Sequence, residues 1–131
     1  MKKTILVIFY IIFFSTCAFS DTKINPIYEG NPDAKIELII YESLTCGHCA
    51  DFHKNVYPQL KESYIDTGLA YIEFKSFPLD LAALNAEIIL RCGNKDEKKF
   101  ELLGIIYKKQ NFWAVGTDIN RINELIMKIS G

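Results

Sequence analysis

Hydrophobic and polar positions along the chain predict a strand, a helix, a second strand and then only helices. Residues 35–41 (KIELIIY) are apolar and β-branched, which indicates a largely buried strand. Apolar positions recur at helical spacing over residues 46–64, and Pro58 is expected to kink this helix or to split it. Residues 69–74 alternate as a second strand would. Residues 21–33, with two prolines and a glycine, predict an extended lead-in that ends in a turn.

The second half of the chain predicts three helices. Residues 81–92 form the first, which should end at Gly93-Asn94, and residues 96 to about 110 form the second. Thr117-Asp118 offers a cap for a third helix that runs to Ile129. The two strands joined through a helix make one βαβ unit, so we expect them to be parallel.

The first twenty residues have the pattern of an export signal. Two lysines follow the first methionine, residues 5–14 are apolar without a break, and Ala18-Phe19-Ser20 resembles a cleavage site. A membrane anchor is the alternative, although the apolar run is short for a hydrocarbon core of ~30 Å. A lipid anchor on Cys17 is a third interpretation, and the residues before it match a lipoprotein signal poorly. We therefore expect residues 1–20 to be a cleaved signal peptide and the mature protein to be exported.

Composition and charge narrow the class of protein. The 131 residues are 50% hydrophobic and 24% charged, which is typical of one globular domain. Fifteen Lys and Arg stand against sixteen Asp and Glu, a net charge of −1. This balance gives no electrostatic footprint for nucleic acid, so no nucleic-acid partner is expected.

The candidate chemistry lies in Cys46-Gly47-His48-Cys49, between the first strand and the helix. Residues three apart share one helix face, so a disulfide between the two cysteines is feasible. Cys46 falls at the helix N-terminus, where unpaired N–H groups and the helix dipole stabilise a thiolate, whereas Cys49 is more shielded. This asymmetry suits thiol–disulfide exchange, with Cys46 reacting, Cys49 resolving the mixed disulfide and His48 favouring the thiolate. A stabilised thiolate also predicts an oxidising couple.

Other interpretations of these residues stay open. The pair could be a structural disulfide, although so tight a loop removes little entropy from the unfolded chain. It could be half of a zinc site with His53 and Cys92, although three ligands on one short helix face make an awkward tetrahedron. The favoured interpretation of His53 is a helix-surface residue. Cys92 is expected to be a small buried helix residue.

Residues 39–49 (IIYESLTCGHC) resemble the active-site segment of exported DsbA-like disulfide oxidoreductases, in particular the alphaproteobacterial branch. The likeness covers nearly all of residues 27–131 and includes YPQL at 57–60, YIDTG at 64–68, FPLD at 77–80 and QNFW at 110–113. The resemblance implies an α/β, thioredoxin-like fold with a helical insertion. Residues 21–80 would be its N-terminal βαβ part with the CxxC pair, and residues 81–131 the insertion.

The resemblance also implies an enzyme, a protein disulfide oxidoreductase with nucleophilic Cys46 and resolving Cys49. The Cys46–Cys49 disulfide would be its redox group, with no separate cofactor and no metal. Unfolded or reduced secreted proteins would be its substrates, and a quinone-linked membrane protein of the DsbB kind would reoxidise it. Gly47-His48 is the dipeptide typical of eukaryotic disulfide isomerases, so oxidase and isomerase both stay open.

The resemblance also predicts that the fold is incomplete. The family continues past the insertion with a strand whose cis-proline faces the disulfide, another strand and a final helix, whereas this sequence ends at Gly131. A non-catalytic, truncated remnant of such an enzyme is therefore the alternative function, and a CxxC metal-binding protein is a further one. Many relatives carry an acidic residue six positions before the first cysteine. This sequence has Ile40 there, and its nearest acid is Glu42.

Overall fold

The structure is a computed structural model that describes residues 24–92 and 98–130. The expected signal peptide, residues 1–20, and the predicted helix end at Gly93-Asn94 lie outside the described residues. Within the described ranges, no helix is both long enough and apolar enough to cross a membrane.

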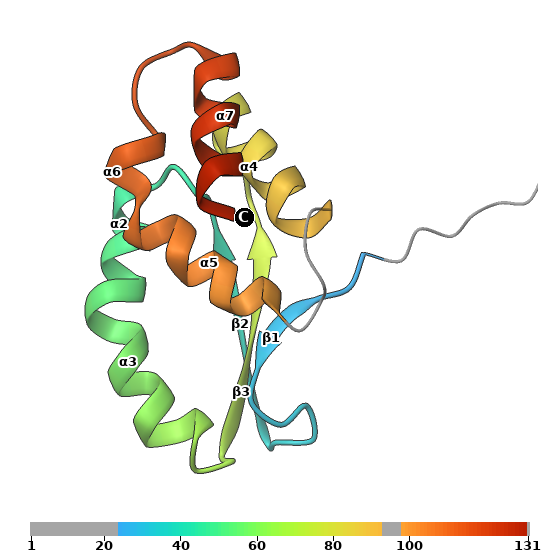
Figure 1. Ribbon diagram of the computed structural model, residues 1–131. Helices are drawn as coiled ribbons and strands as arrows, with labels where there is room; N and C mark the ends of the chain where they lie inside the picture. The colour runs from blue at the N-terminus through green and yellow to red at the C-terminus, as the bar shows by residue number, and fades with distance from the viewer. Residues whose placement is uncertain (1–23, 93–97, 131) are drawn as a thin grey trace, which may run out of the picture.

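A mixed three-stranded sheet in the order β1-β3-β2 forms the centre of the fold (Figure 1). Its strands are β1 (Ile27–Glu29), β2 (Ile36–Glu42) and β3 (Ala70–Ser76). β2 and β3 pair in parallel, with Leu38 opposite Ile72, which confirms the predicted βαβ unit. β1 pairs antiparallel with β3 and places Ile27 opposite Phe74. The predicted extended lead-in and its closing turn are present, with Ala34 N–H donating to the Asn31 carbonyl at 2.9 Å, but the prediction missed the strand within the lead-in. Its short strand forms through pairing with β3, and three residues are too few to show an alternating pattern.

One helical segment with alternating α and π geometry connects β2 to β3. Its parts are α2 (Gly47–Asp51), η1 (Phe52–Val56), α3 (Tyr57–Leu60) and η2 (Lys61–Ile65), where η denotes a π-helical turn. The predicted disturbance at Pro58 takes the form of the π-helical turn η1, because proline lacks the N–H that continues the regular ladder. Gly68 ends the segment with φ +73°, a left-handed conformation that glycine adopts without steric cost.

Four further helices make up the second half of the described chain. They are α4 (Leu81–Cys92), α5 (Lys99–Lys108), α6 (Gln110–Trp113) and α7 (Ile119–Ser130). Asp118 caps α7, because its Oδ1 accepts hydrogen bonds from the backbone N–H groups of Asn120 at 3.0 Å and Arg121 at 3.2 Å. The predicted helix from residue 96 to about residue 110 corresponds in its described part to α5, which ends at Lys108, whereas the short helix α6 after it was not predicted.

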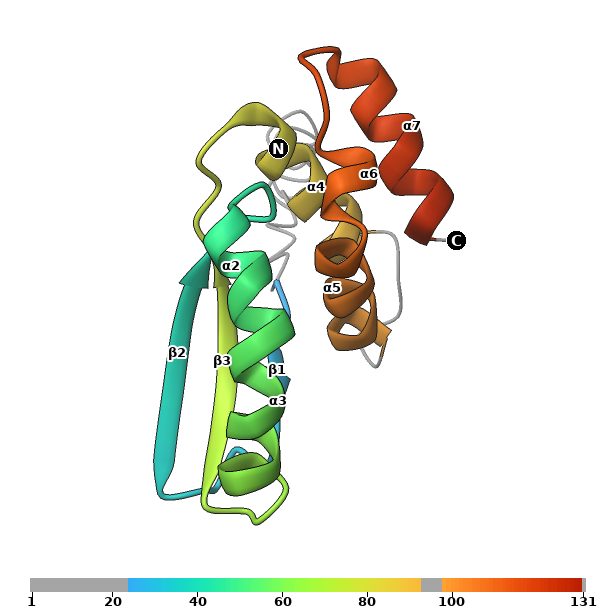
Figure 2. The same ribbon diagram turned by 90° about the vertical axis from the view of Figure 1, so that its left-hand side faces the viewer.

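The helices leave one side of the sheet uncovered in the described structure. Figure 2 shows α2 to α3 running along the sheet, with α4 to α7 gathered on the β1 side, away from β2. One continuous core joins these parts, from Ile72 and Phe74 on β3 to Leu90, Ile106 and Trp113 in the helices.

The prediction that residues 35–41 form a largely buried strand is wrong. β2 is an edge strand of the described sheet, and the exposed fractions of Ile39 and Tyr41 are 43% and 64%. Alternate residues of a strand point to opposite faces, so these two side chains point away from the core while Glu42 is buried. The sequence did not show this alternation, because apolar residues stand on both faces of β2.

Candidate active site

The two cysteines lie where β2 ends and the helical segment begins. Cys46 is the N-cap residue of α2, with extended backbone angles (φ −76°, ψ 119°). Its N–H donates to the Ser43 carbonyl at 3.0 Å, and its carbonyl accepts from Ala50 N–H at 3.1 Å. Cys46 and Cys49 are free thiols and half-buried, and Gly47 and His48 between them are exposed. Solvent can therefore reach this turn.

The thiols of Cys46 and Cys49 differ in acidity, because hydrogen bonds stabilise the thiolate of one and burial disfavours the thiolate of the other. The backbone N–H of Cys49, its thiol and the backbone N–H of His48 donate to the Cys46 sulfur and lower the pKa of Cys46. Burial raises the pKa of Cys49, and the charges of Cys46 and Glu42 add to this increase. A reactive, acidic thiol thus lies beside a shielded one that keeps its proton. The contribution of His48 comes from its backbone, so the predicted effect of its imidazole stays a prediction.

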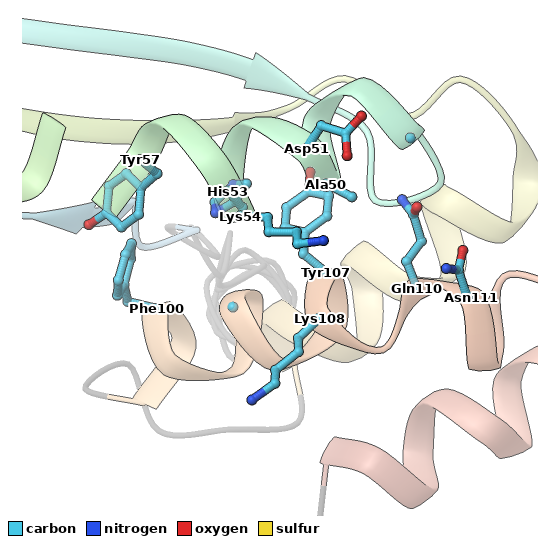
Figure 3. Close-up of a pocket in the computed structure, with 12 residues that line it drawn as sticks. Ala50, Asp51, His53, Lys54, Tyr57, Phe100, Tyr107, Lys108, Gln110 and Asn111 are labelled. Atoms are coloured by element: carbon cyan, nitrogen blue, oxygen red, sulfur yellow. The ribbon is translucent and has the colours of Figure 1, made fainter. Parts of the chain in front are cut away.

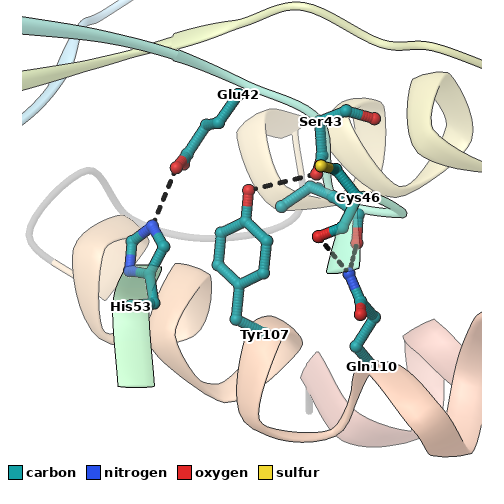
Figure 4. Close-up of polar contacts among 7 residues, drawn as sticks. Glu42, Ser43, Cys46, His53, Tyr107 and Gln110 are labelled. Carbon is teal, nitrogen blue, oxygen red and sulfur yellow. Dashed lines mark hydrogen bonds and ion pairs between the residues drawn. The ribbon is translucent and has the colours of Figure 1, made fainter. Parts of the chain in front are cut away.

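Near the cysteines, the polar side chains of Glu42 and His53 form a buried pair. His53 Nε2 donates to Glu42 Oε2 at 2.8 Å, and the two side chains are 7% and 5% exposed (Figure 4). The His53 ring also stacks on Tyr107, with centroids 4.3 Å apart. The interpretation of His53 as a helix-surface residue is therefore wrong. The last inward-facing side chain of β2 is a carboxylate, and when it is buried it needs a donor from the helix that covers it.

Two side chains from the second half of the chain bind residues 43–46, the turn between β2 and α2 that we call the active-site loop. Gln110 Nε2 donates to the carbonyl oxygens of Leu44 at 2.9 Å and Cys46 at 3.0 Å, and Tyr107 Oη donates to the Ser43 carbonyl at 3.2 Å (Figure 4). Burial, together with the nearby Glu42 carboxylate, raises the pKa of Tyr107, so it stays a neutral donor. The carbonyls of residues 43, 44 and 46 are thus fixed by α5 and α6.

Sequence reasoning missed the roles of Tyr107 and Gln110. Tyr107 lies within the helix predicted from residue 96 to about residue 110, and Gln110 lies in the QNFW segment that resembles the family, but neither pattern assigns a contact to them. Each is 64 or more residues from its acceptor in the loop. Nothing in local spacing signals such a contact.

The described residues do not contain the ligand cluster that the zinc interpretation requires. Among the described residues, no group of three or more His, Cys, Asp and Glu side chains could hold a metal ion. His53 is engaged with Glu42 instead. The expectation that Cys92 is buried is wrong, because it is exposed at the last residue of α4.

Replacing Gln110 by leucine is expected to lower the free energy of unfolding by about 2 kcal/mol, because it leaves buried carbonyl oxygens without their donor. Urea denaturation measures the change. Asn111→Leu is the matched control, since Asn111 is the exposed neighbour in the same helix. Equal losses in both variants would contradict a clamp by Gln110.

In a Cys92→Ser background, iodoacetamide is expected to modify Cys46 before Cys49. Because the pKa of Cys46 is lowered, its thiolate forms at a lower pH than that of an ordinary cysteine, while the raised pKa of Cys49 delays its reaction. Mass spectrometry after brief alkylation between about pH 4 and pH 10 gives both profiles. The urea-unfolded chain is the control, in which both thiols should titrate together. Earlier modification of Cys49 in the folded chain would show that the assignment is reversed.

The fold and this site define a class of protein, a thioredoxin-type sheet with a CxxC pair at the N-terminus of the following helix. The model of the thioredoxin family matches residues 22–128, so the chain belongs to that family and is similar there to its DsbA-like members. This confirms the predicted thioredoxin-like α/β fold with a helical insertion.

Three relatives illustrate the similarity. A Rickettsia bellii protein named "Putative protein-disulfide oxidoreductase" is 39% identical over 107 residues, which are 80% of this chain and 39% of that protein. The crystal structure of Wolbachia pipientis alpha-DsbA1 is 37% identical with a TM-score of 0.69, over 81% of this chain and 52% of that one. A protein-disulfide isomerase from Novosphingobium aromaticivorans shares the fold, at 24% identity and a TM-score of 0.67, over 79% of this chain and 62% of that one. The chain thus spans about two fifths of the Rickettsia protein's length.

Proposed function

We propose that the protein is a thiol–disulfide oxidoreductase of the DsbA type, which forms or exchanges disulfides in secreted proteins. The observation that carries this proposal is the difference between the two thiols of the CxxC turn. Cys46 is an accessible N-cap thiol with a lowered pKa, and Cys49 is more shielded with a raised pKa. A nucleophile and a resolving thiol require this difference.

The oxidation of a substrate starts from the Cys46–Cys49 disulfide, which is itself the redox group. A substrate thiolate attacks Cys46 Sγ, the bond between the two cysteines breaks, and Cys49 leaves as a thiolate that takes up a proton. A second substrate thiolate then attacks the substrate sulfur of the mixed disulfide, and Cys46 leaves as a thiolate. The substrate gains a disulfide by losing two electrons, which the Cys46–Cys49 pair receives. The hydrogen bonds that stabilise the Cys46 thiolate make it a good leaving group in this second step.

The compartment and partners follow from the same proposal. Residues 1–20 would direct export to the periplasm, where reduced secreted proteins are the substrates and disulfides persist. A DsbB-like membrane protein would remove the two electrons from Cys46 and Cys49 and restore the disulfide. The exposure of Gly47 and His48 beside the half-buried Cys46 supports access by both kinds of protein.

A glutathione redox titration of the purified chain tests the proposal, with Cys46 and Cys49 followed by thiol trapping. A single two-electron transition at a potential less negative than about −200 mV is expected, since the stabilised thiolate favours the reduced form. A titration like that of a short unstructured CxxC peptide would contradict the proposal and would favour the non-catalytic remnant. Stoichiometric zinc binding that is lost in Cys46→Ser would favour the metal-binding alternative.

A further inference from the structure

A cleft of about 640 Å³ opens between the helical segment that follows Cys46 and the helices α5 and α6 (Figure 3). One wall includes Gly47, Ala50 and Tyr57, and the opposite wall includes Phe100 and Tyr107. The volume lies within the range of roughly 300–1,000 Å³ in which proteins bind small molecules and peptide side chains. The cleft starts beside the CxxC turn, yet the exchange chemistry does not use most of its length.

Glycines keep both walls open. A Cβ atom at Gly47 or Gly104 would have no atom from another part of the structure within 4 Å, although both residues line the cleft. Gly104 lies in the interior of α5, where glycine stabilises a helix less than alanine does. Close packing therefore does not explain this glycine. Its effect is to leave space in front of the aromatic side chains.

The aromatic side chains of Tyr57, Phe100 and Tyr107 form what we call the aromatic floor of the cleft. Charged side chains lie beside it. Lys54 extends from η1 and Lys108 from α5, and Figure 3 shows them on opposite sides of the cleft. Within residues 24–92 and 98–130, neither lysine has an ion-pair partner. Asp51 is the single carboxylate among the lining residues, so the cleft carries a net positive charge. This combination suits a ligand that has both apolar groups and a carboxylate.

We propose that the cleft binds an extended segment of the substrate polypeptide, with a bulky apolar side chain on the aromatic floor and an acidic side chain near Lys54 and Lys108. This proposal rests on the proposed function, because a polypeptide linked to Cys46 enters the cleft at Gly47. The helical segment advances by ten positions from Gly47 to Tyr57, which corresponds to about 15 Å. An extended peptide covers this length in about four or five residues. The preferred side chains should therefore lie within about five residues of the reacting cysteine.

Equilibrium binding of a fluorescent peptide tests this site without the redox step. The peptide has serine in place of its cysteine, followed within five residues by phenylalanine and glutamate, and a second peptide carries lysine in place of the glutamate. Gly104→Trp places a bulky side chain in the cleft from a position whose Cβ has open space around it, and it is expected to weaken binding of the acidic peptide about tenfold, as measured by anisotropy. Asn120→Trp, on the exposed side of α7, is the matched control and should bind like the parent chain. Lys54→Glu combined with Lys108→Glu should reverse the preference between the two peptides.

Three results would overturn the proposal. They are absence of saturable binding at about 1 mM peptide, equal affinities of the Gly104→Trp and Asn120→Trp variants, and an unchanged preference in the double lysine variant. A melting temperature of Gly104→Trp below that of Asn120→Trp would show that the protein itself fills the cleft, which also overturns it. Failure of the proposed function would be seen separately, as the absence of a two-electron transition in the glutathione titration.

Discussion

Replacing Cys46 by serine is expected to reduce the rate of thiol–disulfide exchange by at least about a thousandfold, because a serine hydroxyl is neither ionised nor able to form a disulfide. Cys46 is the thiol whose anion the structure stabilises, through hydrogen bonds from Cys49 and the His48 backbone. The fold should be retained, since Cys46 is half-buried and serine is close to it in size. The rate is measured as the oxidation of a reduced peptide with two cysteines, and circular dichroism checks the fold.

Replacing Cys49 by serine is expected to have a different effect. The remaining Cys46 can still form a mixed disulfide, but without the resolving thiol this species accumulates and is seen as a shift in mass. Cys92→Ser is the control, because Cys92 is exposed at the end of α4 and should leave both reactions unchanged. Full oxidase activity in Cys46→Ser, or mixed disulfides attached to Cys92, would show that the reacting cysteine is assigned wrongly.

The sequence predicts the parts of the fold that local pattern controls. The bounds of α4, Leu81–Cys92, follow from its helical spacing, and the cap at Asp118 follows from its residue type. The left-handed residue at the end of the helical segment is a glycine, Gly68, the residue type that adopts this conformation without steric cost. The position of Cys46 at a helix N-terminus follows from a strand pattern that changes to a helix pattern. Each of these features depends on residues within one or two turns of one another.

The features that the sequence does not predict depend on distant parts of the chain. The strand β1 exists because β3 pairs with it, and the contacts of Gln110 bridge from α6 to the active-site loop. His53 is one turn past Cys49, and only the end of β2 decides that it faces Glu42 and not water. The carboxylate itself lies four positions before Cys46, on the same face of the strand as Ile40, two residues away. Alternation along the strand predicts the side of Glu42, but not the partner.

The helical second half contributes directly to the chemistry of the CxxC turn. Tyr107 both donates to the Ser43 carbonyl and stacks on the His53 ring, so one side chain of α5 contacts the loop and the buried pair. Cys49 packs against the hydrophobic core, and its burial raises its pKa, with the Glu42 charge adding to the effect. The difference between the two thiols is thus a property of the packed structure as well as of the four-residue motif.

Replacing Glu42 by leucine is expected to lower the free energy of unfolding by about 3 kcal/mol, because it leaves His53 buried without its acceptor. The same change removes a negative charge that raises the pKa of Cys49. The pKa of Cys49 should therefore fall, although burial, the larger cause, remains. Urea denaturation measures the stability, and the pH dependence of alkylation in a Cys46→Ser, Cys92→Ser background measures the thiol.

A double-mutant cycle with His53→Leu separates the pair from the rest of the site. Removing both partners leaves no unpaired polar group, so the double variant is expected to be more stable than Glu42→Leu alone, by about 1 kcal/mol or more. The pKa of Cys49 should stay low in the double variant, because the charge is still absent. Additive losses of stability would contradict a coupled pair at 2.8 Å. A recovery of the pKa of Cys49 on removal of His53 would show that the histidine, and not the carboxylate, controls the acidity of Cys49.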